Sequence, residues 1–186
     1  GKVKLPVFLQ QQLKPKTGDI IEVPDNLEAF LYENDDLQTL TKTFELKREM
    51  GKIVGQHNGA HYYTIGQRKG LQVGGKPLPL FVVGTDTKEN IVFVGQGDDH
   101  KALNRKGLFV NKKDVHWVRE DLKLKLGESQ TYMGRIRYRQ ALSPFTLYQE
   151  EEGLYVVFDE LQRGVTPGQF VAWYLDGELL GSGVID

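Results

Sequence analysis

Short apolar runs bounded by turn-forming residues recur along most of the chain. From residue 51 onward they follow one another at intervals of about ten residues, a spacing typical of antiparallel β-structure. Asp176-Gly177 lies between two of these runs and predicts a two-residue hairpin turn. Residues 87–90 separate FVVGTD from IVFVG and predict a second hairpin. The pattern therefore predicts a mainly β protein.

The first fifty residues are less regular. Apolar positions within residues 5–13 share one helical face and predict a short N-terminal helix that ends before Pro15. Residues 20–23 predict a strand that Pro24 ends. Residues 25–50 begin with an acidic patch and then fit a strand or a helix equally well. We interpret them as an acidic insertion.

The elements divide into two small β-rich domains. We place the first at residues 1–100 and the second at residues 101–186, and we interpret the basic stretch 101–113 as a connector. The evenly spaced strands of the second domain predict a closed antiparallel β-barrel.

Composition narrows the class of protein. The chain has 186 residues, 39% hydrophobic and 26% charged, and no apolar run reaches the roughly 20 residues that span a bilayer, so we expect no membrane partner. There is no cysteine, which excludes a disulfide framework, a thiolate metal site and a cysteine nucleophile and fits a cytoplasmic location. The sequence starts without methionine, and we expect a fragment.

The net charge of −1 conceals segregated charge. In the segment GRIRYRQ, residues 134–140, a strand would place Arg135, Arg137 and Arg139 on one face. Adjacent like charges repel, and a site for a polyanion offsets that cost by neutralising phosphates. The alternative is internal pairing with acidic residues at 150–152 or 159–160.

Other motifs allow two interpretations. Gln67, Arg68 and Lys69 lie between two glycines, in a loop that fits either phosphate contacts or a solvated turn. Residues 166–169, Thr-Pro-Gly-Gln, predict a β-turn. His57 and His61 are four residues apart, but glycines around them disfavour a helix, and we predict no metal site. No known catalytic motif is present.

The ordered set of motifs resembles the tRNA-specific 2-thiouridylase family. The order and spacing match across about residues 51–186, and the opening segment is also similar. Single motifs are weak, but the set is specific. It comprises Gly55-Gln56-His57, YYTIGQRKGL at 62–71, VGQG at 94–97, RIRYRQ at 135–140, VTPGQ at 165–169 and a closing GSGVI.

The resemblance implies a defined activity for a longer parent protein. Members of this family adenylate the wobble uridine, U34, of certain tRNAs with ATP, which also implies magnesium, and then deliver persulfide sulfur to give 2-thiouridine. Their ATP site carries an SGGxDS loop, and catalysis uses two cysteines. This chain has neither the loop nor a cysteine. We therefore expect no catalytic residue and no cofactor here, and an inactive fragment containing the central and C-terminal domains.

The resemblance also assigns residues. Arg137, Tyr138 and Gln169 match positions that the family uses to contact tRNA near its anticodon, whereas Arg135 and Arg139 are added by strand geometry. Gln67, Arg68 and Lys69 match a signature loop of unknown role. The segment between residues 23 and 51 is longer than the family pattern, and its acidity predicts no contact with tRNA.

Two other functions remain open. A non-catalytic RNA-binding module, such as a translation-factor-like barrel, would share the β pattern but not YTIGQRKG. A protein-interaction module would pair its arginines internally.

Overall fold

The computed structural model describes residues 16–186, so the helix predicted at residues 5–13 lies outside the described residues. The structure is 43% strand and 13% helical, which confirms the mainly β class. Within the described part of the chain, no helix is both long enough and apolar enough to cross a membrane.

The described residues form two compact units, and the chain passes between them three times. The first unit contains residues 16–31 together with Phe44–Leu103, and the second contains Tyr32–Thr43 and Asn104–Asp186. Residues 32–43, which the sequence division assigned to the first domain, thus belong to the second unit.

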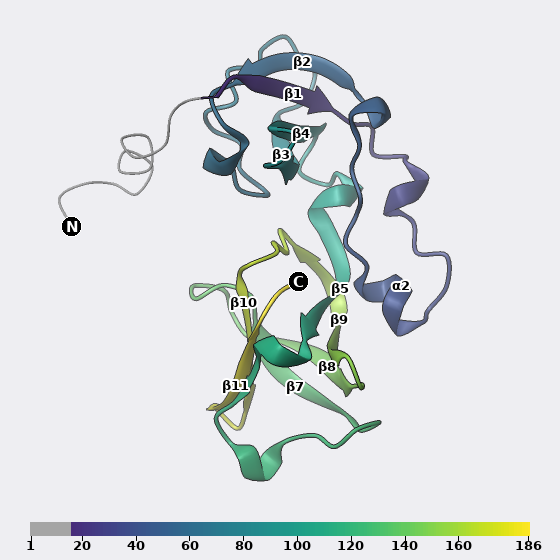
Figure 1. Cartoon of the computed structure of the whole chain (residues 1–186), viewed down its shortest axis with the longest axis vertical. Coiled ribbons are helices and arrows are strands. Elements are labelled where there is room, and N and C mark those ends of the chain that lie inside the picture. Colours follow the sequence, from purple (N-terminus) through teal and green to yellow (C-terminus); the bar gives the residue numbers. More distant parts are fainter. Residues whose placement is uncertain (1–15) are drawn as a thin grey trace, which may run out of the picture. The chain divides into compact units, whose positions relative to one another are not determined.

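The first unit is built on a four-stranded mixed sheet of order β2-β1-β4-β3 (Figure 1). Its strands are β1 (Gly18–Glu22), β2 (Lys52–His57), β3 (Leu80–Asp86) and β4 (Ile91–Gln96). Short 3-10 helices are η1 (Glu28–Phe30), η2 (Arg48–Met50), η3 (Ala60–Tyr62) and η4 (Lys101–Leu103). β1 and β4 are parallel, and the other pairs are antiparallel.

This sheet is covered on both faces. Ile20 and Ile21 are fully buried and belong to two separate hydrophobic clusters. Because successive strand residues point to opposite faces, an unbroken apolar run such as IVFV fits a strand buried on both sides. β3 and β4 pair antiparallel around residues 87–90, which confirms the predicted hairpin.

The second unit is built on a seven-stranded antiparallel sheet of order β5-β9-β8-β7-β10-β11-β6. Its strands are β5 (Asn104–Asn111), β6 (Val115–Trp117), β7 (Ser129–Arg135), β8 (Ser143–Gln149), β9 (Gly153–Arg163), β10 (Phe170–Leu175) and β11 (Glu178–Val184). Its helices are α2 (Leu37–Thr41), η5 (Lys112–Asp114) and η6 (Glu120–Leu122).

The sheet of the second unit curls around one hydrophobic core. Trp117 and Trp173 contact each other in this core with ring centroids 5.2 Å apart. The sheet is a half-barrel rather than the closed barrel that we predicted, since no ladder joins edge strands β5 and β6 among the residues described. The final residue bridges part of the gap, because the Asp186 N–H donates to the Phe109 carbonyl at 3.0 Å.

The predicted hairpin turn at Asp176-Gly177 is confirmed, whereas the predicted connector at 101–113 and the predicted strand at 134–140 are wrong. Asp176 and Gly177 adopt positive φ angles of 49° and 83° and connect β10 to β11. Most of the basic stretch 101–113 forms β5 rather than a connector, because its apolar positions pack into the core. The segment 134–140 leaves the sheet after Arg135 and turns toward β8.

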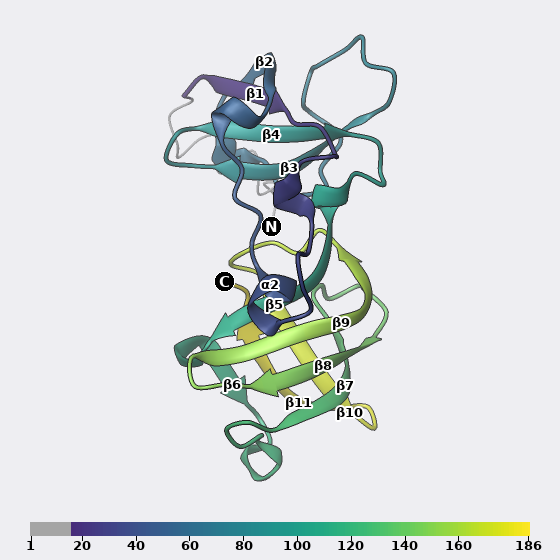
Figure 2. The same ribbon diagram turned by 90° about the vertical axis from the view of Figure 1, so that its right-hand side faces the viewer.

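The segment 32–43 contains the short helix α2, which lies against β5 and β9 (Figure 2). Asp36 caps the helix by accepting a hydrogen bond from the Thr39 N–H at 2.7 Å. The guanidinium of Arg105, 6% exposed, donates to the Thr41 carbonyl at 2.8 Å. This part of the acidic insertion is therefore built into the fold of the second unit.

Candidate nucleic-acid interface

Residues 136–140 form a tight basic turn between β7 and β8, which we call the arginine turn. The Gln140 N–H donates to the Arg137 carbonyl at 3.1 Å and closes it. Ile136 is buried, whereas Arg137, Tyr138 and Arg139 are exposed. The prediction that three arginines share one face of a strand is wrong, because only the first of them, Arg135, belongs to β7.

Arg135 contacts two tyrosines. Its guanidinium carbon lies 5.5 Å from the ring centroid of Tyr138 and 5.3 Å from that of Tyr174. Nη1 donates to the Tyr138 carbonyl at 3.0 Å, and Nη2 donates to the Tyr174 hydroxyl at 3.1 Å. The end of β7 is thus tied to the arginine turn and to β10.

Arg137 links the arginine turn to the loop between β9 and β10. Its Nη2 donates to the Gly164 carbonyl at 2.8 Å, and the Thr166 hydroxyl donates to the same oxygen at 3.0 Å. The structure therefore brings Arg137 close to the Thr-Pro-Gly-Gln turn, two motifs that lie far apart in the sequence.

Residues 166–169 form the predicted β-turn. The Gln169 N–H donates to the Thr166 carbonyl at 3.2 Å, and Gly168 has a φ of 81°, as glycine at the third position of a type II turn requires. The Gln169 side-chain oxygen is buried and accepts no hydrogen bond within the described structure. A buried acceptor of this kind is normally satisfied, so the oxygen of Gln169 is an exception.

The three arginines carry charge that the protein does not neutralise. No ion pair joins Arg135, Arg137 or Arg139 to a carboxylate in the part of the chain that is described. In the acidic segment proposed as their partner, Glu152 instead accepts a hydrogen bond from Tyr155, which lowers the pKa of this carboxyl. The internal-pairing alternative is therefore not what the structure shows.

The loop containing Gln67, Arg68 and Lys69 belongs to the first unit and is held by its own hydrogen bonds. Gln67 accepts from the Thr64 N–H at 3.2 Å and donates to the Lys69 carbonyl at 2.8 Å, and its backbone bonds to Val82 of β3. Arg68 and Lys69 are exposed. Gln67 therefore has a structural role in the loop, and the two cations face solvent.

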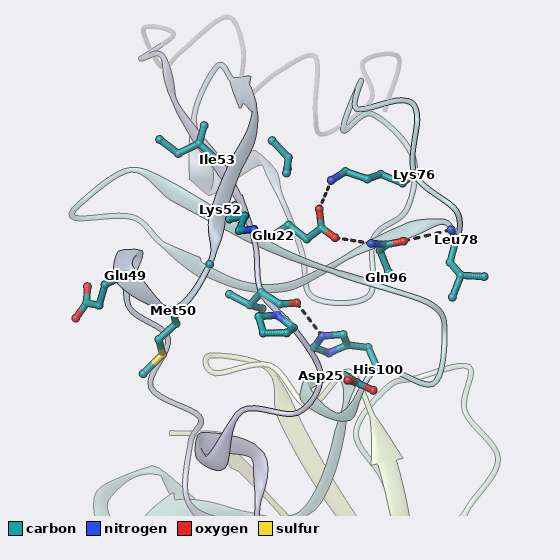
Figure 3. A pocket seen from close by; sticks show the side chains of 14 residues that line it. Glu22, Asp25, Glu49, Met50, Lys52, Ile53, Lys76, Leu78, Gln96 and His100 are labelled. Atoms are coloured by element: carbon teal, nitrogen blue, oxygen red, sulfur yellow. Dashed lines mark hydrogen bonds and ion pairs between the residues drawn. The ribbon is translucent and has the colours of Figure 1, made fainter.

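The first unit also contains an open groove of about 970 Å³ beside β1 and β2 (Figure 3). Its central carboxylate, Glu22, pairs with Lys76 and accepts a hydrogen bond from Gln96. Burial opposes ionisation of Glu22, but the hydrogen bonds from Lys76 and Gln96 outweigh it and lower the pKa of the carboxyl. His100 at the groove is bonded to the Val23 carbonyl at 3.2 Å. The polar side chains of Glu22, Lys76, Gln96 and His100 thus already have partners within the protein.

Comparisons with known proteins support the sequence motifs. A family model described as a tRNA methyl transferase PRC-barrel domain matches residues 42–96, and one described as an aminomethyltransferase beta-barrel domain matches residues 108–185. Proteins named tRNA-specific 2-thiouridylase MnmA match the whole chain in Christiangramia forsetii (54% identity), Flavobacterium johnsoniae (52%) and Karelsulcia muelleri (43%).

The chain belongs to the tRNA-specific 2-thiouridylase family. It covers 49%, 49% and 47% of these three relatives, so it spans about half the length of the curated proteins it matches. The arginine turn and the Thr-Pro-Gly-Gln turn both lie in the part matched by the beta-barrel model.

Sequence reasoning missed several residues that organise this surface. Tyr174 and Gly164 hold Arg135 and Arg137. Gln140 donates to Gln162 of β9 at 2.6 Å. The sequence places Tyr174 two residues before the Asp176-Gly177 turn, on the strand that follows Gln169. Only the pairing of β10 with β7 shows that this tyrosine lies beside Arg135.

Proposed function

We propose that this chain is the tRNA-recognition portion of a tRNA-uridine 2-sulfurtransferase, which makes 2-thiouridine at the wobble position, U34. The observation that supports the proposal most directly is the arginine turn. It presents exposed guanidinium groups and an exposed tyrosine beside the loop that contains Gln169. Arginines bind phosphates, and aromatic rings stack on unpaired bases, which is how proteins commonly recognise RNA loops.

The chemistry belongs to the full-length parent. ATP and magnesium are cofactors of the parent in this proposal, and a persulfide carrier supplies its sulfur. The sequence has no SGGxDS loop, so we propose that neither cofactor is bound by the residues of this chain. We propose that the chain alone neither hydrolyses ATP nor thiolates tRNA, and that the parent acts in the cytoplasm on the anticodon region.

Binding of tRNA by the full chain tests the recognition role. Arg137→Ala is expected to lower affinity about ten- to 150-fold, because a hydrogen bond to a charged group contributes about 1.5–3 kcal/mol. Gln169→Ala is expected to lower affinity less, because the lost group is neutral. Affinity for an unmodified tRNA transcript would be measured by filter binding at several salt concentrations.

The matched control is Lys125→Ala, which removes one positive charge from an exposed lysine before the start of β7, away from the arginine turn. Its affinity should stay close to that of the unchanged chain. Absence of tRNA binding, or equal losses for all three variants, would contradict the assignment.

A further inference from the structure

The three arginines at and just after the end of β7 differ in the number of contacts that they make within the protein. Arg135 makes two hydrogen bonds and contacts two aromatic rings, and Arg137 makes one hydrogen bond. For Arg139, which is exposed, the described structure shows no hydrogen bond or ion pair. Equal roles in binding an anion are therefore not expected.

The guanidinium of Arg135 contacts two aromatic rings and donates two hydrogen bonds within the protein. Its guanidinium carbon lies within 5.5 Å of the ring centroids of both Tyr138 and Tyr174, and both terminal nitrogens donate within the protein. A guanidinium presents its donors in a fixed plane, so two internal acceptors restrict its orientation. A bidentate phosphate contact would require it to give up these partners.

The partners of Arg135 explain how Tyr138 is held. This ring is 86% exposed, so burial does not fix it. Arg135 instead donates a hydrogen bond to the Tyr138 carbonyl and contacts the Tyr138 ring. The other terminal nitrogen of the guanidinium donates to the Tyr174 hydroxyl on β10. β7 and β10 are paired with Arg135 opposite Ala172, so this anchor belongs to the sheet.

We propose that Arg135 is a positioning residue that orders the arginine turn and presents the Tyr138 ring to an unpaired RNA base, while Arg139 holds phosphate. The inference rests on the proposed tRNA-binding function and deepens it. An exposed ring held in one orientation suits base stacking, which contributes about 1–3 kcal/mol per base. A paired stem hides its bases, so the ligand at this turn is a single-stranded loop segment.

The dependence of affinity on salt separates the two roles. Each phosphate contact with a single strand contributes about 0.7 to the slope of log K against log salt. Arg139→Ala should reduce this slope by about that amount, and Arg139→Lys should retain it. Arg135→Ala should lower affinity roughly tenfold with a smaller change in slope, and Arg135→Lys should not restore affinity, because lysine lacks the planar fork.

Two further measurements isolate the stacking role. Tyr174→Phe removes only the hydroxyl acceptor of Arg135 and should weaken binding partially with the slope unchanged. The probes are a labelled stem-loop RNA with an unpaired loop and a duplex of the same stem, and only binding to the stem-loop should respond to Tyr138→Ala. Tryptophan fluorescence confirms folding, because both tryptophans lie in the core of the second unit.

The outcomes are distinguishable. If Arg135→Ala reduces the slope as much as Arg139→Ala does and Arg135→Lys restores both slope and affinity, Arg135 contacts phosphate and the inference is wrong, although tRNA recognition stands. If the unchanged chain binds neither tRNA nor the stem-loop, the proposed function fails and this inference fails with it.

Discussion

At the scale of single residues, His100 shows how a polar side chain is accommodated in an apolar core. It is 2% exposed, its Nδ1 accepts from the Ala102 N–H, and its Nε2 lies 3.2 Å from the Val23 carbonyl. One nitrogen accepts, so the other carries the proton of a neutral ring. Gly95 makes room, since a Cβ there would lie 2.4 Å from the imidazole. The site therefore selects the neutral form.

Stability of the first unit should consequently depend on pH. Burial is the main cause that lowers the pKa of His100 and of His57. A histidine whose pKa is lower in the folded protein binds fewer protons when folded than when unfolded. Its contribution to the free energy of unfolding is therefore present above the unfolded pKa of 6.5 and is lost as the pH falls through the folded pKa. Urea unfolding followed by circular dichroism should give a lower free energy of unfolding at about pH 5.5 than at about pH 7.5.

His100→Gln retains a donor for the Val23 carbonyl but cannot titrate, so this variant should show a shallower pH dependence. His57 continues to titrate and keeps part of the effect. His116→Gln, at an exposed position on β6, is the control and should leave the pH dependence unchanged. A pH dependence identical in all three proteins would contradict the assignment to His100.

At the scale of elements, the loop from β9 to β10 fixes the arginine turn through a glycine. Gly164 has a φ of 71°, and a Cβ there would lie 2.2 Å from Nη2 of Arg137. Gly177 has a similar φ of 83°, but nothing lies within 4 Å of a Cβ built on it. The two glycines therefore share a left-handed backbone conformation and differ in what a methyl group would displace.

Gly164→Ala should lower both stability and tRNA affinity, whereas Gly177→Ala should lower stability alone. Alanine in the left-handed region costs about 1–2 kcal/mol, so both variants should lose about that much in urea unfolding. Only Gly164→Ala displaces Arg137, and its tRNA affinity should fall toward that of Arg137→Ala. Unchanged affinity would show that the link between Arg137 and the Gly164 carbonyl does not serve binding.

At the scale of the whole molecule, the two units are not successive segments of the sequence. Residues 32–43 leave the first unit, pack on the second and return. Their anchor is Arg105. Burial lowers the pKa of its guanidinium, and contact with Tyr32 opposes that shift only in part. The Tyr32 hydroxyl also accepts from the Lys106 N–H at 2.8 Å. Residues 32–43 are therefore an integral part of the second unit.

Arg105→Met should destabilise the second unit by about 1–3 kcal/mol, because it leaves the buried Thr41 carbonyl without its donor. Trp117 and Trp173 both lie in this unit, so tryptophan fluorescence during urea unfolding reports on it directly. Lys106→Met is the matched control, because the Lys106 side chain bonds to Asp159 at an exposed position, and a change within about 0.5 kcal/mol is expected. Equal effects would contradict the anchoring role of Arg105.

Turns and the fold class follow from the sequence alone because their signals are local. Asp-Gly and Pro-Gly set their own φ angles, and short apolar runs between such turns leave little besides β-structure. Local pattern gives the wrong result at GRIRYRQ. The alternation of arginine with other residues predicts a strand, but the chain must turn after Arg135 so that β7 can pair with β8. The basic charge of 101–113 likewise hid the alternating buried positions of β5.

The sequence by itself determined the mainly β class, the hairpins and the motifs that match the thiouridylase family. Only the tertiary structure decided that Arg137 donates to Gly164, that Arg135 contacts two tyrosines, and that residues 32–43 belong to the second unit. Turn preferences arise from the conformations of a few adjacent residues. Pairings across a sheet depend instead on which strands become neighbours, and the burial of the whole core decides that.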